Sequence, residues 1–433
     1  MRWIETTTQD ARKALRRLLE RGAACPPEVE AAVHDIIATV RRRGDAALLR
    51  YTRQFDGWRP RAESLRVSPD EVEAAYAAVG KRDLAVLRQA ARNIRRFHQR
   101  QGQRSWMMKA ADGVRLGMRV APIERVGVYV PGGQAAYPSS VLMNLIPAAV
   151  AEVPRRSMCV PAPQGRLNPY VLVAADLAGA HQVFKIGGAQ AIAALAYGTR
   201  TVPRVDKIVG PGNLYVATAK RLVYGQVDID MIAGPSEIVV VADSSASARY
   251  VAADLLSQAE HSGNEMAALL TPARGLAEAV RGELAGQLRR LPRRREAARS
   301  LSRFGALVVT RSLREAYELV NELAPEHVIL AVRDTEEGLA AVRHAGAIFL
   351  GHYSPETIGD YMAGPNHVLP TNGTARFFSP LQVEQFQKKT SVIAYTREGL
   401  RRLAAPVMRF AEIEGLTAHA EAVRVRLSDS ENL

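Results

Sequence analysis

The stretch QVFKIGGAQAIAALAYG, residues 182–198, shows the pattern that decides the fold. A short strand-forming run ends at a pair of glycines, and an alanine-rich run with helical spacing follows it. The same succession recurs in ERVGVYVPGG (124–133), SMCVPAP (157–163) and DKIVGPGNLYVATAKRLV (206–223). Because strands that alternate with helices form parallel sheets covered on both faces, we expect an α/β fold.

Further along the chain, AGPSEIVVVAD (233–243) predicts one more buried strand, and a second α/β block follows it. The strands expected in this block are FGALVVT (304–310), EHVILAV (326–332) and AGAIFLG (345–351). A chain of 433 residues is too long for one compact core, so we expect two or more domains.

The segments that flank these blocks have other patterns. Residues 1–100 are helical in pattern, and residues 351–390 are rich in Gly, Pro, Asn and Ser, which is typical of a functional loop region. The last stretch, about 380–433, is polar and helical. A polar tail buries little surface by itself, so we expect it to pack on another domain or another subunit.

The net charge of +14 raises the alternative of a basic nucleic-acid-binding protein. Only eight of the 58 basic residues are Lys, however, and the Arg run LRRLPRRREAARS (288–300) alternates with Leu and Ala at helical spacing. No nucleic-acid motif or aromatic platform accompanies the charge. We therefore favour a solvated amphipathic helix and expect no nucleic-acid partner.

The sequence also bears on the compartment. No apolar run reaches the ~18 residues that a membrane helix needs, and the charged N-terminus lacks the apolar region of a signal peptide. Cys25 and Cys159 have no C-x-x-C spacing, which indicates a reducing compartment and no cysteine metal site. We expect a soluble cytoplasmic protein with no membrane partner.

Three glycine-rich turns follow expected strands: VPGGQAAYPSS (130–140), IGGAQAI (186–192) and GPGN (210–213). Each could open a helix whose free N–H groups face an anion. None is the G-x-G-x-x-G fingerprint of a full dinucleotide fold. The alternative is that glycine only allows a tight turn between strand and helix.

Six of the nine histidines lie after residue 260. In DLLSQAEHSGNEMAAL (254–269), Gln258 and His261 are three residues apart and share a helix face, while Glu260 points away from it. From the residues alone, this pair is either part of a metal site or an ordinary capped helix end.

The stretch LAPEHVILAV (323–332) puts an acid–imidazole pair at the start of an apolar strand. Pro325 ends the preceding helix and is expected to give Ala324 extended geometry. Burying Glu326 and His327 is costly unless their polar groups are satisfied or used. Adjacent residues point to opposite faces of a regular strand, so both reach one site only at an irregular strand end.

Three more segments carry polar side chains with candidate roles. They are SPETIGDYMAGPNHVLPT (354–371) with Asp360 and His367, IEGLTAHAEA (413–422) with Glu414 and His419, and AGPSE (233–237) with Ser236. Taken singly, each has an ordinary interpretation as a turn cap, a solvated helix face or an interface pair.

Together these motifs resemble the L-histidinol dehydrogenase family, which catalyses the last step of histidine biosynthesis. Eight segments carry the resemblance in order: VGVYVPGG, GGAQAIAALAYGT, VDKIVGPGN, AGPSE, LLSQAEH, PEHVIL, GDYMAGPNHVLPT and EGLTAHA. The resemblance covers about residues 30–422. The chain departs from the family's pattern at Ser262-Gly263-Asn264, where Gly-Pro is expected, and at Asn372, where Gly is common.

The resemblance implies a role for each polar cluster. It implies a zinc ion held by Gln258, His261, Asp360 and His419, and an acid–base pair of Glu326 and His327. The implied substrate contacts are Ser236, Gln258, His261, His327, Asp360, His367, Glu414 and His419. The implied NAD contacts are Tyr129, Gln190 and Asn213.

The resemblance also implies two incomplete Rossmann-like parallel-sheet domains and a homodimer with shared active sites, with one zinc ion per subunit. The expected parts are an N-terminal helical extension (1–24), a first α/β domain (25–124 and 237–380), a second, NAD-binding α/β domain (125–236) and a C-terminal tail (381–433). Both extensions are expected to pack on the partner subunit, and the tail is expected to enter the partner's active site.

The implied reaction takes L-histidinol to L-histidine through L-histidinaldehyde, with two hydride transfers to NAD. Neither Cys25 nor Cys159 lies in an activating context, so water rather than a thiol is expected to attack the aldehyde. His327 would take the alcohol proton and Glu326 would activate the water. Zinc would orient the substrate and stabilise charge. The alternative is the same scaffold acting on another small amino alcohol or diol.

Overall fold

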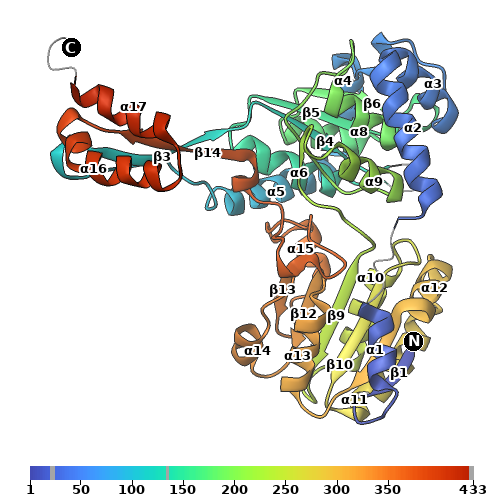
Figure 1. The fold of residues 1–433 in the computed structure, drawn as a ribbon. Coiled ribbons are helices and arrows are strands. Elements are labelled where there is room, and N and C mark those ends of the chain that lie inside the picture. The colour runs from blue at the N-terminus through green and yellow to red at the C-terminus, as the bar shows by residue number, and fades with distance from the viewer. Residues whose placement is uncertain (20–24, 133–135, 429–433) are drawn as a thin grey trace. The chain divides into compact units, whose positions relative to one another are not determined.

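The structure is a computed structural model that describes residues 1–19, 25–132 and 136–428 (Figure 1). The chain divides into two compact units. The first unit comprises Met1–Gln101 and Ile123–Phe386, and the second comprises Gly102–Pro122 and Gln387–Leu433. No helix in the described part of the chain has an apolar stretch long enough to cross a lipid bilayer.

The first unit contains a six-stranded parallel sheet, called the first sheet, with the order β1-β11-β10-β9-β12-β13. Its strands are β1 (Arg2–Glu5), β9 (Glu237–Ala242), β10 (Met266–Thr271), β11 (Gly305–Val309), β12 (His327–Ala331) and β13 (Ala347–Leu350). Its helices are α1 (Ala11–Leu19), α10 (Ala248–Ala259), α11 (Arg274–Leu288), α12 (Arg294–Phe304), α13 (Leu313–Leu323), α14 (Thr335–Ala341) and α15 (Glu356–Tyr361).

Alternation along β9 shows that the first sheet is covered on both faces. Ile238 and Val240 pack with α10, α11 and α12, whereas Val239 and Val241 pack with α1 and α13. Because successive side chains of a strand point to opposite faces, a fully buried strand is apolar at every position. This confirms the α/β fold expected from the sequence.

A five-stranded parallel sheet, called the second sheet, has the order β6-β5-β4-β7-β8. Its strands are β4 (Arg125–Tyr129), β5 (Arg155–Val160), β6 (Gln182–Lys185), β7 (Lys207–Val209) and β8 (Asp228–Ile229). The helices α4 (Pro69–Ala78), α5 (Lys81–His98), α6 (Pro138–Val150) and α7 (Pro169–Leu177) share one core with it. The helices α2 (Pro27–Arg43), α3 (Asp45–Phe55), α8 (Gly188–Tyr197) and α9 (Leu214–Val223) share the core on its other face.

Two parts of the first unit pack differently from the expectation. We expect residues 25–124 to belong with residues 237–380, but α2 contacts α8 and α9, and α5 contacts α6, so these helices cover the second sheet. Consecutive elements tend to be neighbours in space, and the second sheet is the next one along the chain. The N-terminus, expected as a helical extension on the partner subunit, begins with β1, which pairs in parallel with β11 at the edge of the first sheet.

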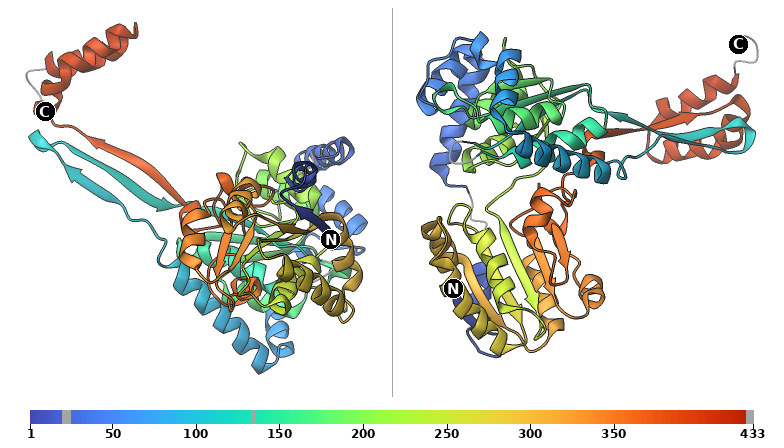
Figure 2. Two further views of the ribbon diagram at one scale, coloured as in Figure 1. Left: turned by 90° about the horizontal axis from the view of Figure 1, so that it is seen from below. Right: turned by 180° about the vertical axis from the view of Figure 1, so that it is seen from behind.

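The second unit is built around a three-stranded antiparallel sheet, so the expectation of a helical tail is incomplete. The sheet comprises β14 (Gln387–Ala394), β3 (Arg115–Pro122) and β2 (Trp106–Lys109), which lie side by side in Figure 2. The helices α16 (Arg397–Ile413) and α17 (Thr417–Ser428) follow β14. A polar strand whose pairing partner lies far away in the sequence leaves no local signal of its own.

Ala324, the residue before Pro325, adopts a left-handed conformation (φ 45°, ψ 58°) instead of the extended geometry that we expect before a proline. Its N–H donates to the carbonyl oxygen of Val320 at 2.8 Å and so closes α13. A left-handed residue is a common way to end a helix, and here this C-cap outweighs the preference of a residue that precedes proline.

A buried ion pair fixes the turn between β7 and α9. Lys220 Nζ donates to Asp230 and to the Gly210 carbonyl oxygen, while Asp230 accepts the N–H groups of Gly210 at 2.7 Å and Met231 at 2.6 Å. The side chains of Lys220 and Asp230 are only 3% and 1% exposed. A Cβ atom at Gly210 (φ 110°) would lie 2.0 Å from the Tyr129 carbonyl oxygen, so the turn requires glycine.

The substitution Lys220→Met should destabilise the fold strongly. It leaves the carboxylate of Asp230 buried without its cation, and breaking a buried pair in this way costs about 3–5 kcal/mol. Urea denaturation measures the loss. As a control, Arg314→Met removes the exposed pair with Glu318, whose partners are 85% and 61% exposed, and should cost less than about 1 kcal/mol. Similar small losses in both variants would contradict the role given to the buried pair.

Candidate active site

The acid–imidazole pair lies at the amino edge of the first sheet. Glu326 immediately precedes β12 and His327 is its first residue, and these residues are 6% and 4% exposed. Glu326 Oε2 lies 3.8 Å from His327 Nδ1. Because Glu326 lies outside the regular strand, its side chain and that of His327 can reach the same site, as we expect at an irregular strand end.

The environment of His327 leaves one ring nitrogen available. Nδ1 lies 3.0 Å from the carbonyl oxygen of Glu237, which can only accept a hydrogen bond. Burial lowers the pKa of His327, so the ring favours the neutral state with its proton on Nδ1. Nε2 is buried without a hydrogen-bond partner among the described residues, and Oε1 of Glu356 lies 3.9 Å away from it. His327 Nε2 is therefore a proton acceptor.

Burial raises the pKa of Glu326 well above the usual range of a carboxyl group. The nearby carboxylates of Glu237, Asp360 and Glu356 raise the pKa further, while a hydrogen bond from the Glu237 N–H opposes them. A carboxylate with a raised pKa is a stronger base than an exposed one. Both members of the pair are therefore suited to proton transfer.

Two carboxylates beside this pair form a potential metal-ligand group with His327. Ligand atoms of His327, Glu356 and Asp360 all lie within 4.8 Å of one another. Ser257 Oγ donates to Glu356 at 3.1 Å. Burial, and then the neighbouring Glu356, raises the pKa of Asp360. Two buried carboxyl groups at this separation favour either a shared proton or a bound cation.

Gln258 lies in the last turn of α10 and is completely buried. Neither its Oε1 nor its Nε2 has a hydrogen-bond partner in the described part of the chain. Buried amide groups are nearly always hydrogen-bonded, so this side chain indicates a missing partner. An amide oxygen can serve as a metal ligand beside imidazole and carboxylate, so the donor atoms present fit a divalent metal.

His261 lies outside the helix that carries Gln258. The helix α10 ends at Ala259, and His261 is exposed, so the two side chains do not share one helix face as we expect. The reason is the tight C-terminal turn, in which the N–H of Glu260 donates to carbonyl groups of α10. His261 instead lines a cavity of about 460 Å³ together with Glu260 and Asp360.

Two further expected substrate residues lie in this region. His367 Nε2 is 3.3 Å from Ser140 Oγ, and its Nδ1 is 3.1 Å from the carbonyl oxygen of Asp360. It lines a cavity of about 250 Å³ with His327 and Asp360. Burial lowers the pKa of His367 to about 4, so the ring is neutral at physiological pH. Ser236 is half-buried and directly precedes Glu237 at the start of β9.

Glu414 and His419 belong to the second unit, whereas the other expected metal and substrate residues belong to the first. Glu414 caps the end of α16, and His419 lies in the first turn of α17. Both side chains are exposed. The first unit by itself therefore lacks one of the four expected metal ligands.

The three expected NAD contacts follow strands of the second sheet. Tyr129 ends β4, and its hydroxyl accepts the N–H of Gly188 at 3.1 Å, where α8 begins. Gln190 is buried in the first turn of α8, and its Oε1 has no hydrogen-bond partner in the described residues. Asn213 is exposed and caps α9 by accepting the N–H of Val216. A free helix start and an unpaired buried oxygen at the carboxyl edge of a parallel sheet fit a nucleotide.

The third glycine turn, VPGGQAAYPSS, is described only in part, because residues 133–135 lie outside the described residues. Cys159 is buried, and burial raises the pKa of its thiol. Cys25 Sγ lies 3.1 Å from Thr218 Oγ1. Neither cysteine lies in one of the cavities that His261 or His327 lines.

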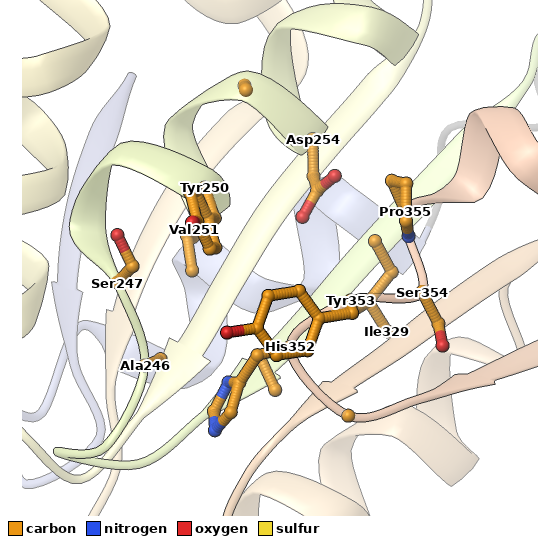
Figure 3. A pocket seen from close by; sticks show the side chains of 13 residues that line it. Ala246, Ser247, Tyr250, Val251, Asp254, Ile329, His352, Tyr353, Ser354 and Pro355 are labelled. Carbon is orange, nitrogen blue, oxygen red and sulfur yellow. The ribbon is translucent and has the colours of Figure 1, made fainter.

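A separate cavity of about 360 Å³ lies between α10 and the loop after β13 (Figure 3). Tyr250, Asp254 and Tyr353 are among its lining residues, and no expected site residue lines it. Burial, and then the charge of Glu356, raises the pKa of Asp254 to about 7. Asp254 precedes Gln258 by four residues on α10, but the lining of this cavity shares no residue with the expected site.

Sequence reasoning missed two buried acids of this region, Glu237 and Glu356. Each had a signal. Glu356 precedes Asp360 by four residues, which is the spacing of neighbours on a helix. Glu237 stands before the apolar run of β9 just as Glu326 stands before that of β12. The reasoning that identifies Glu326 as a candidate therefore applies to Glu237 as well.

Comparison with known proteins gives a consistent result. The family model described as histidinol dehydrogenase matches residues 19–427. The histidinol dehydrogenase of Syntrophotalea carbinolica is 53% identical over 99% of this chain and 100% of its own length. That of Geobacter metallireducens is 54% identical over 95% of this chain and 94% of its own length.

A solved structure agrees with these relatives. The crystal structure of histidinol dehydrogenase from Elizabethkingia anophelis superimposes with a TM-score of 0.93 at 37% sequence identity. The match covers 99% of this chain and 98% of that one. The likeness therefore extends over both units and includes every motif that carries the resemblance. The chain belongs to the histidinol dehydrogenase family.

Proposed function

We propose that this chain oxidises L-histidinol to L-histidine through L-histidinaldehyde, with NAD as the hydride acceptor and a divalent zinc ion in the site. The observation that carries the proposal is the buried Glu326–His327 pair, in which His327 Nε2 has no hydrogen-bond partner in the described part of the chain. Carboxylate oxygens of Glu356 and Asp360 lie close to His327, and the buried amide of Gln258 has no hydrogen-bond partner in the described residues. A comparison of turnover with histidinol and with other small amino alcohols and diols tests the substrate.

The metal would be held by Gln258, His261, Asp360 and His419. Their donor set of amide oxygen, imidazole nitrogen and carboxylate suits zinc. Support comes from the unpaired oxygen of Gln258 and from the raised pKa of Asp360, because both are relieved by a cation. When bound, zinc would orient the alcohol and stabilise negative charge on its oxygen.

Tyr129, Gln190 and Asn213 would hold NAD, and the reaction would consume two NAD molecules in turn, one for the hydride released in each oxidation step. In the first step His327 Nε2 takes the proton of the alcohol, which its lone pair and neutral ring permit. In the second step Glu326 takes a proton from water as that water attacks the aldehyde carbon. Ser236, His367 and Glu414 are assigned to holding the substrate.

We also propose that the enzyme is a homodimer in which the second unit of one subunit completes the site of the other. The second unit has a small buried core that includes Val114 and Ala411, whereas Ile393, Phe410 and Ile413 are 71%, 64% and 68% exposed. Exposed apolar side chains at this density are typical of an interface. The two expected site residues that lie on this unit, Glu414 and His419, would then serve the partner.

The variant Glu326→Gln should separate the two steps. It keeps the size of the side chain but removes the base, and a lost general base costs about 10²–10⁴ in rate. We expect this loss when L-histidinaldehyde is supplied and a much smaller one for reduction of the first NAD when L-histidinol is supplied. His327→Ala should impair both. Stopped-flow measurement of NADH formation checks this, and equal slowing of both steps in Glu326→Gln would remove the role in water activation.

Removal of the metal should abolish turnover, and zinc should restore it. Gln258→Leu preserves the approximate volume but removes the amide oxygen, so we expect less zinc per subunit as measured by mass spectrometry of the purified protein. Gln287→Leu, a substitution on α11, is the matched control and should retain the zinc of the wild type. Full turnover after verified metal removal would overturn the assignment of zinc.

Mixing two inactive variants should restore activity if active sites are shared. In a hybrid of His261→Ala and His419→Ala subunits, one site carries both substitutions and the other carries neither. Up to about half of the sites in each hybrid dimer should therefore work. Turnover after co-refolding is measured, with hybrids verified by native mass spectrometry. Verified hybrids without activity would argue against exchange of the second unit.

A further inference from the structure

Glu237, the first residue of β9, makes a reciprocal pair of hydrogen bonds with Glu326. Its main-chain N–H donates to Glu326 Oε2 at 3.0 Å, and its own Oε2 accepts the main-chain N–H of Glu326 at 3.1 Å. The other oxygen, Oε1, accepts the N–H of Asn372 at 3.0 Å. Glu237 is 3% exposed, so these bonds are made out of contact with bulk water.

The same residue also contacts His327, through its main-chain carbonyl oxygen at 3.0 Å from Nδ1. Glu237 therefore touches both members of the acid–base pair with three different groups: its N–H, its carbonyl oxygen and its carboxylate. The pairing of β9 with β12 continues from this point, with His327 opposite Ile238.

A second buried carboxylate at this place has an energetic cost. Desolvation of a charge is unfavourable, and two carboxylates in a low-dielectric site repel each other. An apolar residue at the start of β9 would avoid that cost, but it would leave the N–H groups of Glu326 and Asn372 without this acceptor. A residue that costs stability and forms several hydrogen bonds to a reactive pair is expected to hold that pair in position.

We propose that Glu237 is a positioning residue for the Glu326–His327 pair, and that its carboxylate fixes the main chain of Glu326 so that the Glu326 carboxylate is aimed at the substrate. The inference rests on the proposed function, because it assigns the task of Glu237 from the task of Glu326. Glu237 is not proposed to touch the substrate or the cofactor.

The two members of the pair depend on Glu237 in different ways. His327 is held by the strand ladder and by a main-chain carbonyl group, and neither is lost when the Glu237 side chain changes. Glu326 precedes the strand, so its main-chain N–H relies on the Glu237 carboxylate. In Glu237→Gln only one of the two side-chain oxygens remains, so either the Glu326 or the Asn372 N–H faces an amide nitrogen.

The experiment measures the two half-reactions of the zinc-loaded Glu237→Gln enzyme separately. With L-histidinaldehyde we expect a fall in kcat of about 10–10²-fold, which is typical of a displaced catalytic group. With L-histidinol, we expect formation of the first NADH to change by less than about 3-fold, since His327 stays in place. KM for both substrates and zinc content should match the wild type.

Asp45→Asn is the matched control. Asp45 is another carboxylate, 10% exposed, that accepts a main-chain N–H, that of Thr201 at 3.2 Å, but it lies on α3 beside the second sheet. It should lower the melting temperature as any lost buried hydrogen bond does, and leave the ratio of the two half-reactions unchanged. A change of this ratio in Glu237→Gln alone would support a positioning role.

Two results would overturn the inference: equal slowing of both half-reactions, or no slowing of either. If Glu237→Gln does not fold, Glu237→Asp replaces it, because this variant keeps the charge but is too short to reach both N–H groups, and the same selective loss is expected. Failure of both variants to fold would show a purely structural residue. A wild-type enzyme that does not oxidise L-histidinol would refute the proposed function instead, so the two failures are distinguishable.

Discussion

The structure of the site depends on how charge is accommodated at the amino edge of the first sheet. Parallel strands begin with main-chain N–H groups that the ladder does not use, and the loops before them carry more. Three neighbouring strands meet this need with a buried glutamate: Glu237 at β9, Glu265 before β10 and Glu326 before β12. Glu265 accepts the N–H groups of Ser262 and Gly263, and the other two accept each other's. These glutamates thus accept main-chain N–H groups at strand starts, as capping side chains do at the starts of helices.

This constraint explains why the reactive groups lie where they do. Glu326 is held by these hydrogen bonds and is desolvated, and desolvation raises the pKa of its carboxyl group. Rigid geometry and a raised pKa are what a general base requires. The expected NAD contacts lie instead at the carboxyl edge of the second sheet, where helix starts provide N–H groups without a carboxylate. The carboxylates at the amino edge of the first sheet thus suit a cation, whereas the helix starts at the carboxyl edge of the second sheet suit an anion.

Much of this architecture could be predicted from the sequence, because local patterns encode it. The apolar runs at β4, β9 and β12 and the glycines after β6 and β7 specify strands and turns by themselves. Three features depended on distant partners and could not be predicted: the pairing of β14 with β3, the packing of α2 and α5 on the second sheet, and β1 at the edge of the first. The buried environment of Gln258 was hidden for the same reason, since burial is a tertiary property.

The candidate site shows the same division. The identity of Glu326 and His327 follows from an unusual polar pair before an apolar strand, whereas the role of Glu237 appears only when two strand starts are seen side by side.

Two side chains of the folded chain bear on the proposed metal and on the proposed dimer. The amide oxygen and nitrogen of Gln258 have no hydrogen-bond partner in the described residues, and Phe410 on the second unit has an exposed ring. A folded chain tolerates few buried unpaired polar groups and few large exposed apolar ones, so each indicates a partner outside the chain. In the proposed function a metal ion would satisfy the first deficit and a second subunit the second. His419 would connect the two, because it lies on the second unit and is expected to bind the metal.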